Sequence, residues 1–224
     1  MMNRVIFYTG SVNIMSFDSK KPKFDKDKKY PQKRPGIRLW RTPDPDTGEF
    51  PELDEAKLKR LREKAQNYCF WAMSQSDKTR AELEQKMRAK NCPEDILVET
   101  LDKMEELGYL SDQRFAESFV YSSTVLRKKG KRRVEQDLRR KGVSSEIIEE
   151  AVAATSPEDE RVRAVEIVEK KLRGTAKLEP RKRKERLAGF LIRNGYDFGM
   201  AFSVVDEVLM AEGEERDDSD LLVD

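Results

Sequence analysis

Histidine is absent from the 224 residues of this chain. It is the side chain most often used as a general base and the commonest metal ligand in proteins. The chain also lacks any GxxxxGK[ST], GxGxxG or GxSxG segment, the patterns of phosphate-binding loops, dinucleotide-binding folds and nucleophile elbows. No spacing singles out a pair of carboxylates. The sequence therefore predicts no catalytic residue, no cofactor-binding residue and no metal site, and we do not expect an enzyme.

Cysteine and long apolar runs are also scarce. The two cysteines, Cys69 and Cys92, have no paired spacing, which is typical of reduced core thiols rather than of a disulfide or a zinc site. No apolar run approaches the roughly 18 residues that a membrane span requires. The N-terminal residues lack the apolar core and the cleavage site of a secretory signal. These features are typical of a cytoplasmic protein.

Charged residues, in contrast, are abundant. They make up 39% of the chain against 37% hydrophobic residues, whereas an average globular chain is about 25% charged. This excess favours thin helical layers with much solvated surface over one thick core. The formal net charge is only +2, so any affinity for nucleic acid must come from local clusters of basic residues.

Apolar residues recur every three to four positions from Leu53 to Met210, which is the spacing of amphipathic helices. The pattern divides into three similar units of three helices. Superposition by hand aligns Leu83 with Val134 and Leu187, Met87 with Leu138 and Leu191, Asn91 with Gly142 and Gly195, and Ile96 with Ile147 and Met200. The sequence therefore predicts an all-α fold of three tandem three-helix repeats. We expect an elongated array, because units of this kind contact mainly their sequence neighbours.

Five segments are expected along the chain. The repeats span residues 53–108, 109–155 and 156–210. Residues 1–52 hold six of the nine prolines and no helical or strand period, which predicts a disordered basic arm. That arm is either a solubilising tail or a weak electrostatic tether to nucleic acid. Residues 211–224 hold seven acidic residues and one arginine and form an acidic tail.

The first helix of the middle repeat carries an apolar stripe that includes Phe115, Phe119 and Leu126. Phe115 and Phe119 are four positions apart on this stripe, so we expect both to lie in the core. The rival interpretation is an exposed aromatic pair that stacks on nucleic-acid bases.

Basic residues crowd into two segments at matching positions of the second and third repeats. A solvated helix face normally alternates charges, so two runs of one sign favour contact with an anionic partner over a merely solvated surface. That partner is either a phosphate backbone or an acidic protein groove. The candidate partner-binding residues are Arg127, Lys128, Lys129, Lys131, Arg132, Arg133, Arg139, Arg140, Lys141, Arg181, Lys182, Arg183, Lys184 and Arg186.

A three-helix unit with a glycine turn also suggests a helix-turn-helix, in which the helix after the turn enters the major groove. In the middle repeat that helix begins at Ser144 and carries Glu146, Glu149 and Glu150. Acidic side chains are repelled by the phosphates that flank the groove. We therefore expect no sequence-specific base recognition, and any contact with DNA should be to its backbone.

Several motifs resemble the RecX family of bacterial recombination regulators. The resemblance covers about residues 60–210 and is weaker in the third repeat. It departs from the family pattern at Ser111, where Asp or Asn is usual, at Gly189 inside a helix, and in the extensions at both ends. The motifs that carry it are Arg80-Ala81-Glu82-Leu83, Lys86-Met87, Leu107-Gly108-Tyr109-Leu110-Ser111-Asp112, Arg114-Phe115-Ala116-Glu117, Lys129-Gly130, Leu138 and Lys141-Gly142-Val143.

This resemblance implies a regulatory protein that binds the RecA recombinase and its nucleoprotein filament on DNA, lies along the filament groove and inhibits strand exchange and ATP hydrolysis. Its roles would be homologous recombination, DNA repair and the SOS response. The alternative is a non-specific DNA-binding helical protein, which would bind bare DNA as tightly as the filament. We expect a monomer, because the repeats bury their apolar faces on one another.

Overall fold

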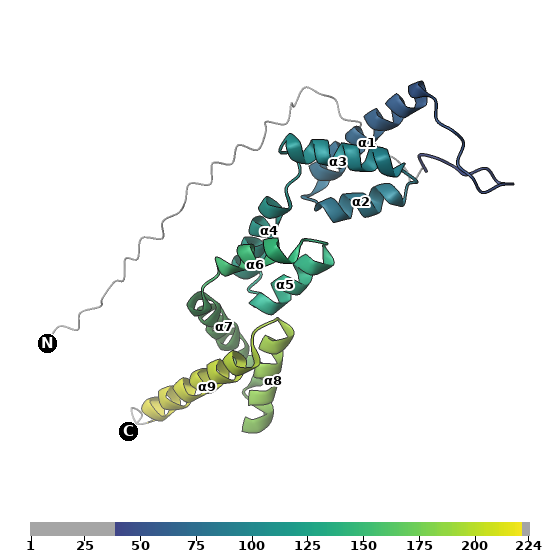
Figure 1. Ribbon diagram of the computed structural model, residues 1–224. Coiled ribbons are helices and arrows are strands. Elements are labelled where there is room, and N and C mark those ends of the chain that lie inside the picture. Colours follow the sequence, from purple (N-terminus) through teal and green to yellow (C-terminus); the bar gives the residue numbers. More distant parts are fainter. Residues whose placement is uncertain (1–38, 221–224) are drawn as a thin grey trace.

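The computed structural model describes residues 39–220, with side chains described as far as Gly213. Every regular element in that range is helical, and the predicted all-α architecture of three-helix units is confirmed. The units follow one another along an elongated molecule (Figure 1). Their helices are α1 (Glu55–Gln75), α2 (Arg80–Arg88) and α3 (Glu94–Glu106), then α4 (Asp112–Tyr121), α5 (Lys131–Arg140) and α6 (Ser145–Ala153), then α7 (Pro157–Leu172), α8 (Pro180–Arg193) and α9 (Phe198–Asp220).

Most helices begin at residues that the local sequence marks as caps. The Thr79 hydroxyl accepts a hydrogen bond from the Glu82 N–H, and the Glu82 carboxylate accepts one from the Thr79 N–H. This reciprocal capping box satisfies two N–H groups that the helix itself leaves unpaired. Serine hydroxyls accept the equivalent bond from a backbone N–H at the starts of α4, α6 and α7, from Ser111, Ser144 and Ser156.

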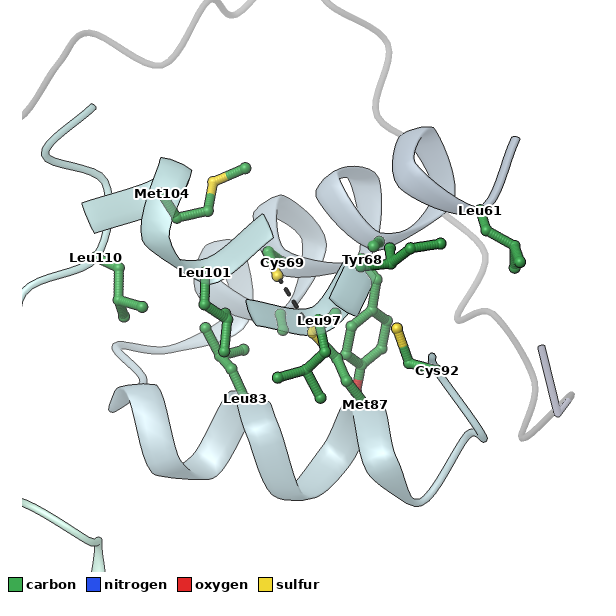
Figure 2. Packing of buried hydrophobic residues seen from close by; sticks show 13 residues of the cluster. Leu61, Tyr68, Cys69, Leu83, Met87, Cys92, Leu97, Leu101, Met104 and Leu110 are labelled. Atoms are coloured by element: carbon green, nitrogen blue, oxygen red, sulfur yellow. Dashed lines mark hydrogen bonds between the residues drawn. The ribbon is translucent and has the colours of Figure 1, made fainter. Parts of the chain in front are cut away.

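Each unit has a small apolar core of its own. In the first unit Leu83, Met87 and Leu97 are fully buried between α1, α2 and α3 (Figure 2). In the second unit Phe115 is only 9% exposed, and its ring stacks on that of Phe119 with the centroids 5.9 Å apart. The prediction that Phe115 is a core residue is therefore confirmed. The third core centres on Leu187, Leu191, Tyr196, Val204 and Val205.

The two cysteines belong to the first core as free, buried thiols. The Cys69 sulfur lies 3.7 Å from that of Met87 (Figure 2). Burial raises the pKa of both thiols to about 12, so they stay protonated near neutral pH and act as small apolar side chains.

Trp40 and Arg41, in the part of the predicted arm that the structure describes, contact the first unit, whereas residues 42–52 are exposed. The Trp40 ring meets the Tyr68 ring edge-on at 5.5 Å, and the Lys64 ammonium lies over the Trp40 ring at 5.5 Å. These contacts fix Trp40 at the side of α1, and the disorder expected for the rest of the arm stays a prediction. Residues 1–38, which carry most of the predicted arm, lie outside the described residues.

The last helix continues past the predicted boundary at residue 210. α9 runs through Asp220, into the acidic tail, and residues 221–224 lie outside the described range. The sequence pattern ends earlier than the helix because the acidic residues after Met210 carry no apolar stripe.

Candidate partner-binding surface

The second helices of the three units, α2, α5 and α8, are joined end to end. The Thr79 hydroxyl, at the start of α2, donates to the Lys141 carbonyl at the end of α5 (2.6 Å). The Gly130 N–H, at the start of α5, donates to the Asn194 carbonyl at the end of α8 (2.9 Å). The positive end of one helix dipole thus meets the negative end of the next. We call this series the second-helix row. It follows one side of the molecule (Figure 1) and brings the two basic clusters into succession.

Glycine is required at both joints of the row, because the helices approach too closely for a Cβ atom. A Cβ on Gly142 would lie 2.3 Å from the Ala81 Cβ, and one on Gly195 would lie 2.3 Å from the backbone nitrogen of Arg133. Both glycines also have a positive φ, 76° and 91°, which side chains disfavour. Sequence reasoning identified them only as the ends of helices.

Carboxylates of a neighbouring unit pair with several candidate cations at these joints. Burial opposes the charge on Glu82, but the Lys141 ammonium at 2.8 Å and the Thr79 N–H hold the pKa of its carboxyl below the usual value. Three candidate residues thus help to hold the units together. The pairs are Lys141 with Glu82, Lys128 with Glu166, and Arg132 with Asp197.

Asp137 neutralises part of the middle cluster from inside the unit. Its carboxylate is 9% exposed and lies 2.7 Å from Lys129, 3.3 Å from Arg133 and in contact with Arg140. Burial raises the pKa of this carboxyl, but hydrogen bonds from Lys129 and Arg140 outweigh burial and hold it below its usual value. Because three cations share one carboxylate, the surface around it keeps a net positive charge.

In the α8 cluster, carboxylates of α9 cover two of the five cations. Arg183 is buried and forms a bidentate pair with Glu212, at 2.6 and 3.0 Å, while Lys184 pairs with Asp206 at 2.6 Å. Arg183 also donates to the Thr175 hydroxyl. Arg183 is therefore occupied in the packing of its own unit, and we remove it from the candidate surface.

The cations that stay available lie mainly on and beside α5. Among the residues that the structure describes, no ion pair occupies the exposed side chains of Arg127, Lys131, Lys182 and Arg186. Arg139 and Arg140 are 55% and 65% exposed, and their pairs lie within α5; Arg181 is likewise exposed and paired within α8. Pairs between exposed groups, such as Arg181 with Glu185, are worth only about 0–1 kcal/mol, so a stronger anionic partner can displace them. The partner of Arg140 is the buried Asp137, but that carboxylate is shared with two other cations.

Sequence reasoning missed the apolar side chains beside this cluster. Leu126, which was assigned to the apolar stripe of its helix, is 71% exposed. The reason is that α4 ends at Tyr121 and the chain continues as a wider π-helical turn, η1 (Ser122–Leu126), which changes the face on which each side chain lies. No local signal in the sequence marks this change of helix type.

Every helix within residues 39–220 is too short or too polar to span a bilayer. No group of three or more potential metal ligands comes together among the described side chains, which end at Gly213.

Comparisons with known proteins point to one family. Residues 111–152 match the model of the second three-helix domain of RecX, and residues 158–205 match that of the third. The chain is 37% identical over 177 residues to regulatory protein RecX of Mycolicibacterium smegmatis, covering 76% of this chain and 94% of the relative. It is also 37% identical over 155 residues to regulatory protein RecX of Streptomyces coelicolor, covering 69% and 82%.

The fold is shared with solved structures. The crystal structure of RecX from Lactobacillus salivarius superposes with a TM-score of 0.63 at 22% identity, covering 68% of this chain and 99% of that one. A second crystal structure of regulatory protein RecX superposes with a TM-score of 0.61, again at 22% identity.

Proposed function

The chain belongs to the RecX family of regulatory proteins, and from this premise we propose that it binds the RecA recombinase and its nucleoprotein filament and inhibits RecA activity in recombination and DNA repair. It is a regulator rather than an enzyme. The observation that carries the proposal is the second-helix row, which aligns basic clusters of two units along one side of an elongated array.

Regulation of this kind needs no chemistry from the protein. A regulator shifts the assembly of a filament when it binds one state of the filament more tightly than another. Three linked units give many weak contacts, and linkage makes dissociation slow because each released contact stays near its partner site. The array therefore suits a partner whose own surface repeats along an axis.

The exposed cations of the row are the side chains that we assign to this contact. They attract an anionic groove on the filament, and any contact with its DNA is to the backbone without sequence preference. The protein acts as a cytoplasmic monomer in this proposal, because each unit closes its apolar core with its own helices.

The test is the ATP turnover of RecA on single-stranded DNA while this protein is titrated in. We expect turnover to fall, and unchanged turnover at saturating protein would contradict the proposed function. Hydrolysis of ATP by the purified protein alone would contradict its assignment as a regulator.

A charge-reversal pair locates the contact. Arg127→Glu with Arg139→Glu replaces exposed cations near α5 and should weaken inhibition strongly at low salt and less at high salt. The matched control, Lys59→Glu with Lys103→Glu, changes the same number of exposed cations in α1 and α3, outside the row. Equal loss of inhibition in the two variants would mean that inhibition depends on the net charge of the protein and not on a contact near α5.

A further inference from the structure

The turn between α4 and α5 reverses the usual distribution of polarity. It buries Ser123 and Thr124, which are 0% and 5% exposed, and it exposes Tyr121, Val125 and Leu126, which are 62%, 43% and 71% exposed. The Thr124 hydroxyl donates to the Val120 carbonyl at 2.9 Å, whereas the Ser123 hydroxyl oxygen has no hydrogen-bond partner. Burying a hydroxyl while exposing aliphatic side chains costs free energy, so folding of this unit alone does not account for the arrangement.

The π-helical geometry gathers the three exposed side chains on one face. The Arg127 N–H donates to the Ser122 carbonyl five positions earlier, at 3.2 Å. Such i→i+5 bonds widen the turn, so that residues four and five positions apart both lie close to the same side. Val125 and Leu126 therefore both lie near Tyr121, whereas a regular α-helix would turn Leu126 away from it.

The third unit holds this turn in place. Lys128 has a φ of 51°, a conformation that a long side chain seldom adopts without support. Its carbonyl accepts a hydrogen bond of 2.9 Å from the hydroxyl of Tyr196, which is 1% exposed. Burial raises the pKa of Tyr196 to about 12, so the hydroxyl remains a donor at neutral pH. The exposed face is therefore presented by a supported turn.

The surroundings of this face indicate the chemistry of its partner. Arg127 directly follows the turn and Lys131 begins α5 four residues later, and both are exposed and without an ion pair among the described residues. An apolar centre with a charged rim is the composition of a protein interface. Phosphate groups do not interact favourably with aliphatic side chains. Of the three residues only Tyr121 has a ring that could stack on a base, so the exposed Val125 and Leu126 favour a protein surface over nucleic acid.

We propose that Tyr121, Val125 and Leu126 form an apolar anchor that docks into an apolar pocket with an acidic rim on the protein subunits of the recombinase filament. This inference rests on the proposed function and assigns different roles to the basic row and to the apolar anchor. The basic row attracts the filament at long range in a salt-dependent way, while the anchor supplies short-range affinity that depends little on salt.

The experiment measures binding of the full chain to RecA filaments on single-stranded DNA, and to the same DNA alone, across a salt series. Val125→Ser with Leu126→Ser should weaken filament binding about tenfold or more at every salt concentration, as expected for a central interface residue. Binding to bare DNA and the thermal midpoint should not change. Tyr121→Ala, made separately, should weaken filament binding in the same way.

The matched control is Val162→Ser, which removes a valine that is 58% exposed on α7 and should bind the filament like wild type. Wild-type filament affinity in the Val125→Ser, Leu126→Ser protein overturns the anchor, and so does an equal loss on filament and bare DNA. A wild-type protein that binds no filament overturns the proposed function itself. The two failures are therefore distinguishable.

Discussion

The interior joints of the array and its N-terminal end provide different hydrogen-bond donors for the last carbonyl of a second helix. At each joint, the last carbonyl of a second helix accepts a hydrogen bond from the start of the second helix before it. The equivalent carbonyl of α2 belongs to Lys90, and no three-helix unit precedes α1 among the residues that the structure describes. This carbonyl accepts a bond of 2.7 Å from the Trp40 N–H. Trp40 and Arg41 thus take the position that a neighbouring second helix takes at the interior joints, and they cap this end of the described array.

The residue after that carbonyl differs in a way that follows from its neighbour. Asn91, Gly142 and Gly195 are equivalent and share a positive φ, at 58°, 76° and 91°. The two glycines face a helix start that leaves no room for a Cβ. Asn91 faces an extended segment and uses its side-chain amide to donate to the Arg41 carbonyl at 3.0 Å. The same positive-φ conformation is thus adopted by glycine where a neighbouring helix leaves no room for a Cβ atom, and by asparagine where the side chain makes a hydrogen bond.

The largest effect should come from Gly195→Ala at the second joint. The new Cβ meets the backbone of Arg133, which cannot move aside as a flexible side chain would. Overpacking and the positive φ together should lower the free energy of unfolding by about 2–5 kcal/mol. Urea denaturation followed by circular dichroism measures it.

The control for this change is Gly108→Ala. Gly108 has a φ of 71°, but a Cβ added there would have no other atom within 4 Å. The substitution should therefore cost only the conformational part, about 1 kcal/mol. Equal costs at the two glycines would show that the close approach at the joint contributes nothing.

The next largest effect should come from Trp40→Ala at the capped end. Loss of the ring contacts with Tyr68 and Lys64 should destabilise the first unit by about 1–3 kcal/mol. Amide hydrogen exchange should speed up in α1, α2 and α3 while α7, α8 and α9 keep their protection. Phe50→Ala is the control, because Phe50 lies in the same segment but is 44% exposed. Unchanged protection of α1–α3 in the Trp40 variant would refute the capping role.

A smaller effect is expected from Glu82→Gln at the first joint. Glutamine keeps the capping-box geometry but loses the charge that faces Lys141. The folded-state pKa of Glu82 is lowered, so its charge stabilises the fold above the unfolded value of about 4.3 and this contribution disappears as pH falls through the lowered value. The variant should therefore be less stable than wild type by under about 1.5 kcal/mol at pH 7. Urea unfolding of both proteins across a falling pH series measures the difference, which should shrink as the Glu82 carboxylate becomes protonated. A difference that stays constant over the whole series would exclude the charge as its cause.

The smallest effect should come from Asn91→Gly at the capped end. Glycine relieves the positive φ but gives up the hydrogen bond to the Arg41 carbonyl. The two terms are similar in size and opposite in sign, so the net change should be within about 1 kcal/mol. Asn91→Ala, which loses the bond and keeps the strain, should be the less stable of the two. The thermal midpoint of each variant shows whether the side-chain hydrogen bond of Asn91 stabilises the protein.

Much of the fold was predictable from the sequence because it depends on local features. Caps such as Thr79 and Ser156, and apolar stripes such as that of Leu83 and Met87, act within a few residues of each helix. The three-repeat pattern is itself a property of the sequence. The basic clusters were also found from the sequence, since a run of like charges is a local property.

Which carboxylates form ion pairs with those basic residues was decided by the tertiary structure. Arg183 meets Glu212 and Lys141 meets Glu82 only because packed helices bring together residues that are far apart in the chain. The docking of Trp40 on Tyr68 is a contact of the same kind.

Helix identity and repeat number were thus determined by the sequence alone, because hydrogen bonds and side-chain spacing along a helix involve residues at most one turn apart. Which cations stay free, which glycines sit at joints and which face of η1 is exposed were decided only by tertiary packing. These properties depend on how closely one unit approaches the next, and that distance is set by the shapes of both surfaces.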